Sequence, residues 1–293
     1  MKKNYCSPAR YEYGEKYGTC LNKKELTEIA QNVNVPITTK TSKKSLATSI
    51  KKKLEPKCGE RETCWLKYIH DPDKRQSITK TAYRPEKPRE WLKNPRMWLN
   101  TYDILNVMSQ YEARYKSFRF FGVYPIDFTD SNSNGICIGE SLCNFHIKKL
   151  LAQKKKKFGI VLNLDKHTQG GSHWVALFCN LDTKSKTNFG IYYYDSIASK
   201  PDTYNREKYV TRFMNQVCNQ VKEVMGDTVG KRFENKYNVV QRQFKNTECG
   251  NFSQIFITQM LKNIPFDEIC KRMPLDDDVQ KARDVFYRPP NSN

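Results

Sequence analysis

The stretch Asn246-Thr247-Glu248-Cys249-Gly250 places one cysteine where an extended segment gives way to a helix. The apolar residues after it recur at helical spacing: Phe252, Ile255, Phe256, Met260 and Leu261. This pattern predicts an amphipathic helix over residues 249–262, with Thr247 as its N-cap and Glu248 as an acid in its first turn. We therefore expect the Cys249 sulfur to lie at the start of a helix.

That position favours the charged form of a cysteine. Unpaired backbone N–H groups and the positive end of the helix dipole stabilise a thiolate relative to a thiol. Gly250 beside it leaves room for a substrate backbone to approach. The ordinary alternative is a buried structural thiol. The neighbouring elements decide between a nucleophile and a packing residue.

A β-hairpin upstream supplies a histidine and an aspartate. The sequence predicts strands over residues 173–179 and 189–194, with a turn in the polar stretch between them. His173 and Asp195 each lie 11 residues from Lys184, so an antiparallel hairpin folded there brings them to one edge of the sheet. Asp195 would orient the imidazole, whose other nitrogen would face a thiol. Taken singly, each is also an ordinary strand-end or turn residue.

The stretch 237–244 predicts another strand that leads to Cys249. It contains glutamines, which are unusual in a core strand, and Gln243 lies six residues before Cys249. Its amide and the Cys249 backbone N–H would form an oxyanion hole for an attacked carbonyl. Asn246 or Gln241 could take this role instead, and a solvent-facing glutamine is the ordinary alternative.

Together these residues resemble the signature of Ulp-type SUMO proteases and the adenovirus protease clan. The similar features are His173-Trp174, the Tyr-Asp pair ending at Asp195, and Gln243 followed after five residues by Cys249-Gly250. Within the clan, the Thr-Glu-Cys-Gly segment most resembles the polyprotein protease of African swine fever virus, which has an asparagine where this chain has Asp195. The resemblance covers residues 96 to 262.

The resemblance implies an α+β fold, with a central mixed, largely antiparallel sheet flanked by helices. It implies a cysteine protease that cleaves Gly-Gly-X sites. In that reaction Cys249 is the nucleophile, His173 the base, Asp195 the orienter and Gln243 an oxyanion donor.

The resemblance also suggests residues that contact substrate. Trp98 opens a segment similar to the start of Ulp-type catalytic domains, where a tryptophan helps to form a narrow channel for the substrate glycines. Opening an amphipathic helix is an equally good interpretation of Trp98. Trp174, Asn246 and Gly250 are the other candidate substrate-binding residues.

The chain reads as two domains. Residues 1–85 form a basic, mainly helical arm domain, with helices marked by Leu26, Ile29, Ala30 and Val33 and by Leu46, Ile50 and Leu54. Helix, extended link and basic helix also resemble a SAP-like nucleic-acid-binding module. Prolines between Tyr83 and Pro95 mark a linker, and residues 86–293 form the catalytic domain. Within it we expect helices from Tyr102 and over 209–225, and a strand over 158–164.

The chain has ten cysteines, which could form disulfides or bind a metal. The chain is long, and its start at Met1-Lys2-Lys3-Asn4 does not resemble a signal peptide, so we expect reduced thiols and a soluble protein made on cytosolic ribosomes. No apolar run is long enough for a membrane span. Cys58, Cys64 and His70 fall at six-residue steps, which are wider than usual for zinc ligands, and we expect no metal site.

The chain has a net charge of +20, which favours a polyanionic partner or a charged substrate. Non-specific nucleic-acid binding would weaken with salt. We expect no required cofactor, with DNA as an optional activator because the adenovirus relative uses it so. The alternative is a cationic, solvated surface, to which the run Lys154–Lys157 would belong.

Three classes of function remain. The first is a maturation protease of a large DNA virus, which cleaves viral core precursors at Gly-Gly-X sites in the virus factory of the host cytoplasm and in the virion. The second is a deconjugase of SUMO or ubiquitin, and an acetyltransferase of the same clan is a further enzyme of this type. The third is a non-enzymatic nucleic-acid-binding protein, against which an intact His173, Asp195, Gln243 and Cys249 argues.

Overall fold

The computed structural model describes residues 5–290, so Met1–Asn4, on which the signal-peptide prediction depends, lie outside the described residues. The chain divides into two compact units. One contains the described residues up to Pro88 together with those from Phe286 onward, and the other runs from Arg89 to Val285. The C-terminal end joins the first unit because Arg288 pairs with Glu86 and its backbone N–H donates to the Pro85 carbonyl at 2.8 Å. The sequence had assigned this end to the catalytic domain.

The smaller unit is helical. Its α-helices are α1 Tyr11–Tyr17, α2 Lys23–Asn32, α3 Lys43–Cys58 and α4 Pro72–Ala82, with 3-10 turns at Pro8–Arg10 and Glu62–Tyr68. Asn22 and Glu25 form a capping box at the start of α2, and Ser42 caps α3. The predicted apolar positions of both helices, from Leu26 to Leu54, are buried in one core.

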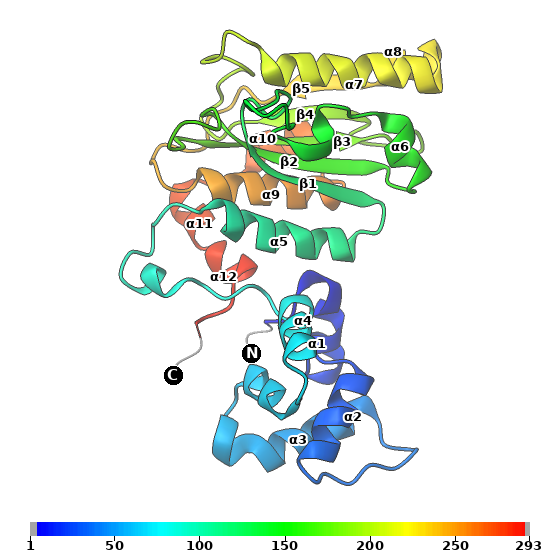
Figure 1. Cartoon of the computed structure of the whole chain (residues 1–293), viewed down its shortest axis with the longest axis vertical. Coiled ribbons are helices and arrows are strands. Elements are labelled where there is room, and N and C mark those ends of the chain that lie inside the picture. The colour runs from blue at the N-terminus through cyan, green and yellow to red at the C-terminus, as the bar shows by residue number, and fades with distance from the viewer. Residues whose placement is uncertain (1–4, 291–293) are drawn as a thin grey trace. The chain divides into compact units, whose positions relative to one another are not determined.

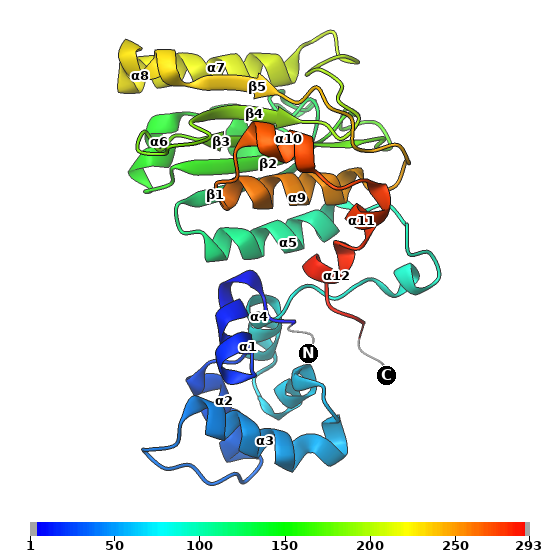
Figure 2. The same cartoon turned by 180° about the vertical axis from the view of Figure 1, so that it is seen from behind.

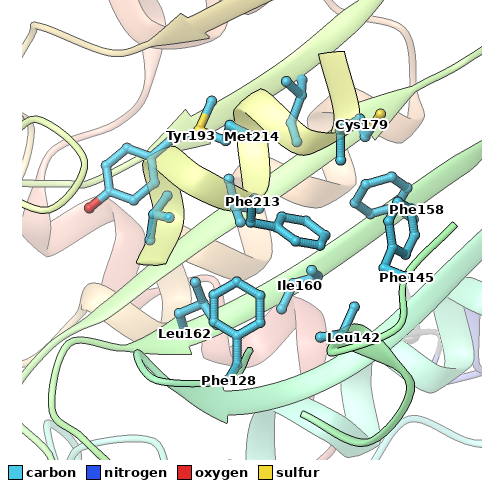
Figure 3. Packing of buried hydrophobic residues seen from close by; sticks show 14 of the residues in the cluster. Phe128, Leu142, Phe145, Phe158, Ile160, Leu162, Cys179, Tyr193, Phe213 and Met214 are labelled. Atoms are coloured by element: carbon cyan, nitrogen blue, oxygen red, sulfur yellow. The ribbon is translucent and has the colours of Figure 1, made fainter. Parts of the chain in front are cut away.

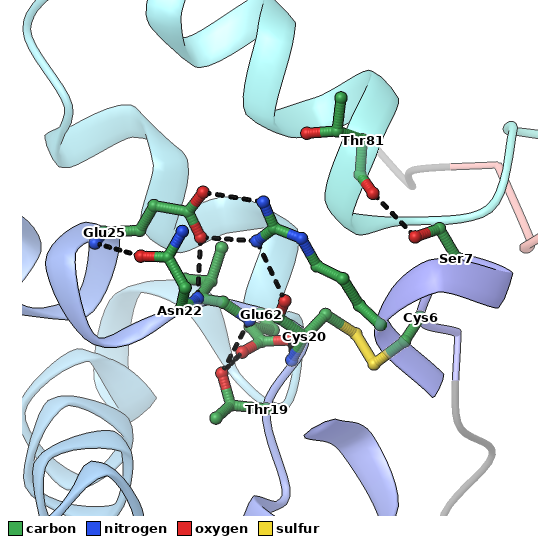
Figure 4. The surroundings of a disulfide bond; sticks show 10 residues. Cys6, Ser7, Thr19, Cys20, Asn22, Glu25, Glu62 and Thr81 are labelled. Atoms are coloured by element: carbon green, nitrogen blue, oxygen red, sulfur yellow. Dashed lines mark hydrogen bonds and ion pairs between the residues drawn. A yellow bond between two sulfur atoms is a disulfide. The ribbon is translucent and has the colours of Figure 1, made fainter. Parts of the chain in front are cut away.

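Figure 4 shows the Cys6–Cys20 disulfide in this unit, beside a buried polar cluster. Arg10 forms a bidentate pair with Glu25 at 2.6 and 2.9 Å, and Glu62 accepts from the Cys20 backbone N–H at 3.0 Å. Burial raises the pKa of Glu62 despite its hydrogen bonds. The cluster fixes the loop between α1 and α2 to the 3-10 turn at Glu62–Tyr68.

The expectation of reduced thiols is wrong for six of the ten cysteines. They form the pairs Cys6–Cys20, Cys58–Cys64 and Cys137–Cys143, with Cα separations of 5.1, 5.6 and 6.0 Å. These separations suit a disulfide, and spatial proximity of this kind cannot be read from composition. Cys58 and Cys64, weighed above as zinc ligands, are therefore bonded to each other. The free cysteines are Cys179, Cys218, Cys249 and Cys270.

The larger unit contains a five-stranded sheet in the order β1-β2-β3-β4-β5. The strands are β1 Phe118–Pro125, β2 Lys157–Asn163, β3 Trp174–Asn180, β4 Gly190–Tyr194 and β5 Glu234–Tyr237. The pairs β1–β2 and β4–β5 are parallel, whereas β2–β3 and β3–β4 are antiparallel. The predicted α+β fold with a mixed sheet is confirmed, although antiparallel pairs make up half of the sheet rather than most of it.

Helices cover both faces of this sheet (Figures 1 and 2). The helices of the larger unit are α5 Thr101–Arg114, α6 Ile147–Ala152, α7 Tyr209–Met225, α8 Asp227–Arg232, α9 Cys249–Leu261, α10 Phe266–Arg272, α11 Asp276–Gln280 and α12 Arg283–Phe286, of which Phe286 belongs to the smaller unit. The helix α7 packs on one face, and α9 lies with α5 on the other. Among the described residues, no helix is both long and apolar enough to cross a bilayer.

The two faces of the sheet bury different sets of side chains. On the α7 face, Phe213 lies among Phe128, Phe145 and Phe158, with ring centroids 5.3, 5.3 and 6.3 Å away (Figure 3). On the other face, Tyr194 stacks on Phe256 of α9 at 4.9 Å. Burial of each such ring contributes about 1.5–3 kcal/mol. The helix that begins with Cys249 is thus fixed to the central strands.

Two local predictions need correction. Asn180 lies opposite Gly190, so the hairpin is centred on Ser185 rather than on Lys184. The strand expected over 237–244 is β5, which ends at Tyr237, and the chain then continues without regular structure to Cys249. Val239, Val240 and Phe244 are exposed there, so this segment could not form a buried central strand.

Candidate active site

His173 and Asp195 meet at one end of the central strands. His173 directly precedes β3, Asp195 directly follows β4, and His173 Nε2 lies 2.7 Å from Asp195 Oδ1. The Asp195 side chain is fully buried, and its backbone is fixed by Asn238, which accepts from the Asp195 N–H at 2.8 Å and donates to its carbonyl at 2.6 Å. The contact that the hairpin predicted is present, because the aspartate side chain compensates for the shifted register.

The environment of His173 favours its protonated form. Burial lowers the pKa of His173, but hydrogen bonds to Asp195 and Cys249 and the charges of both groups outweigh burial and raise this pKa to about 9. Only 14% of the His173 side chain is exposed, so solvent screens these interactions little. At neutral pH this imidazole therefore carries a proton and can stabilise a negative charge beside it.

Cys249 is the first residue of α9 and is 2% exposed. The N-cap is Glu248 rather than Thr247, and it makes no side-chain cap hydrogen bond. Glu248 is instead fully buried, where it accepts from Asn251 Nδ2 at 2.5 Å and pairs with Arg283 at 3.3 Å. The sequence showed the acid beside the cysteine but not its buried partners.

A cleft of about 660 Å³ lies beside His173. Its walls contain Trp98, Gln243 and Asn246, which the sequence singled out. Its remaining lining residues are Ser172, Ile197, Gln241, Phe244 and Lys245. Phe244 is 68% exposed although it is a large apolar side chain, and Trp98 is 44% exposed. Two aromatic side chains that remain open to solvent therefore line the cleft.

Gln243 is held rigidly in the wall of the cleft. It is 2% exposed, its Oε1 accepts from Ser196 Oγ at 2.6 Å and its Nε2 donates to the Lys245 carbonyl at 2.6 Å. One Nε2 hydrogen remains after this bond, since an amide nitrogen carries two. Gln241 donates to the Gln243 carbonyl at 2.8 Å, which stabilises the turn that leads towards Cys249.

Trp174 and Gly250 both lie beside Leu99, and their contact with substrate stays a prediction. Trp174 is 8% exposed, and its indole N–H donates to the Leu99 carbonyl at 2.9 Å, outside the cleft lining. A methyl group on Gly250 would lie 3.0 Å from Leu99 Cβ and Cδ1. Both residues therefore contact Leu99, the neighbour of Trp98.

Several known proteins are similar to this chain in sequence or in fold. Residues 142–289 match the Ulp1 protease family, C-terminal catalytic domain. A thiol protease of Acanthamoeba polyphaga mimivirus is 27% identical over 97% of this chain and 93% of its own length. The SUMO-1 cysteine protease of African swine fever virus is 27% identical over 48% of this chain and 47% of its own. The crystal structure of the African swine fever virus protease has a TM-score of 0.64 at 19% identity, covering 97% of this chain and 96% of that one, so the two share a fold.

Proposed function

The chain belongs to the Ulp1 protease family and is a cysteine protease, and from this premise we propose that it is an endopeptidase that cleaves viral precursor proteins after Gly-Gly. The observation that carries the proposal is the 2.7 Å contact between His173 and Asp195, at the edge of a cleft that Trp98 and Phe244 line. The resemblance inferred from the site residues is confirmed by the family match.

In the proposed reaction, the Cys249 thiolate attacks the carbonyl carbon of the second glycine. The carbonyl π electrons move to its oxygen, which the Cys249 N–H and the free Nε2 hydrogen of Gln243 stabilise. His173, protonated at neutral pH, then gives its proton to the leaving amine as the C–N bond breaks and an acyl-enzyme remains. A water molecule, deprotonated by His173, attacks the thioester and releases the acid. Asn246 and Gln241 are the alternative oxyanion donors in the cleft.

The cleft supports a preference for glycine. Trp98 and Phe244 both line it, and both side chains are partly exposed to solvent. A residue without a side chain lets an extended backbone pass between flat aromatic walls where a larger residue would not fit. We assign the two glycines of the substrate to this part of the cleft, between Trp98 and Phe244.

Relatives from two viruses support a role in virus maturation. We propose viral core precursors as substrates and the virus factory of the host cytoplasm and the virion as the places of action. The second candidate function is removal of SUMO or ubiquitin-like proteins, which the name of the African swine fever virus relative favours. A substrate comparison distinguishes the two: a deconjugase releases whole SUMO or ubiquitin tails faster than it cuts short Gly-Gly-X peptides.

The decisive experiment is a cleavage profile on a peptide library, with Cys249→Ala and Cys249→Ser as controls. We expect cuts after Gly-Gly with the native chain and none with either variant, while circular dichroism shows both variants folded. Full cleavage by Cys249→Ala would eliminate the proposed nucleophile. Cuts at sites without glycine would agree with a thiol protease but contradict the specificity assigned to it.

The proposed reaction requires no cofactor, and DNA is proposed only as an activator. Three ammonium groups of the run Lys154–Lys157 already contact the protein: Lys155 donates to the Phe118 carbonyl at 2.8 Å, Lys156 pairs with Asp182 at 3.2 Å, and Lys157 donates to Asn263 at 2.6 Å. Turnover measured with and without duplex DNA over a salt titration tests activation. An unchanged rate throughout would reject it.

A further inference from the structure

The backbone carbonyls on either side of Trp98 are both held by side chains. Arg283 Nη2 donates to the Met97 carbonyl at 2.7 Å, and the Trp174 indole donates to the Leu99 carbonyl at 2.9 Å. Trp98 itself is 44% exposed in the cleft. The position of this cleft wall is therefore set by the bonds to its two neighbours.

Each of these two side chains also connects to the proposed catalytic pair. Trp174 follows His173 in the chain. Arg283 Nη2 lies 3.3 Å from Oε2 of Glu248, the residue before Cys249. The Trp98 segment is thus tied on one side to the base and on the other side to the nucleophile.

The Arg283 contact is buried and has several components. The exposed fractions are 2% for Arg283 and 0% for Glu248. The guanidinium also lies 4.5 Å from the centre of the Trp91 ring, on the segment that leads to Met97. A guanidinium suits this place, because its planar fork presents donors to two acceptors and its face to an aromatic ring.

We propose that Arg283 is a positioning residue that couples the Trp98 wall of the cleft to the turn that carries Cys249. One side chain bonds both the carbonyl before Trp98 and the carboxylate before the nucleophile, so the wall and the sulfur keep a fixed separation. The inference rests on the proposed function, because the wall matters for catalysis only if substrate passes it. A displacement of about 1 Å in such a wall can lower turnover about a hundredfold.

The test compares Arg283→Met with Arg283→Met combined with Glu248→Gln. The single variant leaves a buried carboxylate without its cation and should unfold at a lower temperature. The combined variant removes both charges and should regain most of that stability, but the Met97 carbonyl stays unbound. We expect its kcat/KM for a Gly-Gly-X peptide to remain at least about tenfold below that of the native chain. Alkylation of Cys249 by iodoacetamide needs no substrate channel. Its rate in the combined variant should therefore stay within about threefold of the rate in the native chain.

Two outcomes overturn the proposal. If turnover recovers together with stability in the combined variant, Arg283 only neutralises Glu248. If alkylation falls as much as turnover, Arg283 acts on the nucleophile and not on the wall. Arg272→Met is the matched control, because Arg272 is 79% exposed on α10 and, within residues 5–290, its ion pair is with Glu268 in its own helix. It should match the native chain in every measurement.

Amide hydrogen exchange separates this proposal from the proposed function. In the combined variant, a peptide covering residues 97–104 should exchange about tenfold faster than in the native chain and in Arg272→Met. Faster exchange in the combined variant, together with a native chain that fails to cut any Gly-Gly-X peptide, would reject the substrate and keep the coupling. Unchanged exchange would reject the coupling whatever the substrate is.

Discussion

The raised pKa of His173 predicts that this residue makes stability depend on pH. The pKa is 6.5 in the unfolded chain and about 9 in the folded protein. Between pH 6.5 and about 9, the folded state therefore keeps a proton on His173 that the unfolded state has lost. The stabilisation is complete below pH 6.5 and disappears as the pH rises through 9. Its size is about 3 kcal/mol, because each pKa unit corresponds to about 1.4 kcal/mol.

The perturbation that isolates this contribution is His173→Gln. Urea unfolding of the native chain and the variant at pH 6, 8 and 10 gives two free-energy profiles. Lysines and tyrosines titrate alike in both proteins, so their effects cancel in the difference. We expect the stability advantage of the native chain to shrink by about 3 kcal/mol between pH 6 and pH 10. Cys249→Ala should show a smaller change, because only Asp195 then holds the proton.

Nuclear magnetic resonance provides an independent check. The chain has four histidines, and the signal missing from His173→Gln identifies His173 in a spectrum of ¹³C-labelled protein. That signal should titrate near pH 9. Titration at or below 6.5, or parallel stability profiles of the two proteins, would refute the reasoning that Asp195 and Cys249 outweigh burial.

Three further substitutions test other parts of the structure. Gly250→Ala should lower the free energy of unfolding by about 1–3 kcal/mol in urea, because the new methyl group meets Leu99 at 3.0 Å, and an unchanged value would mean that Leu99 moves freely. Gln243→Ala should lower kcat about 10²–10³-fold with little change in KM in steady-state assays, whereas a pure KM effect would exclude an oxyanion role. Cys6→Ser should remove the Cys6–Cys20 bond and destabilise the helical unit by about 3 kcal/mol in the same unfolding assay, and no loss would argue against that bond.

Periodic patterns allowed the sequence to predict several elements closely. The helix α7 has the expected bounds, Tyr209–Met225, and α9 begins at Cys249 as expected. The contact between His173 and Asp195 was also predictable, because hairpin geometry brings the outer ends of two strands together. A register error of two residues did not matter there, since a side chain can span it.

Contacts between distant parts of the chain could not be predicted in this way. The bond from Arg283 to Met97 joins residues 186 positions apart, and its acceptor is a backbone carbonyl that any residue would supply. Strand β1 was missed because Phe118–Pro125 lies on an edge and pairs with β2 across a long crossover. The contacts of Trp174 and Gly250 with Leu99, far away in sequence, were unpredictable for the same reason.

A thiol reductant added to this protein would have two opposite effects on its cysteines. The nucleophile must stay reduced, since an oxidised sulfur cannot attack a carbonyl. Three pairs of cysteines close loops of 14, 6 and 6 positions, and the same reagent would open them. A preparation rich in dithiothreitol and one exposed to air would therefore be two different samples, and their activities should be compared only after the free thiols of each have been counted.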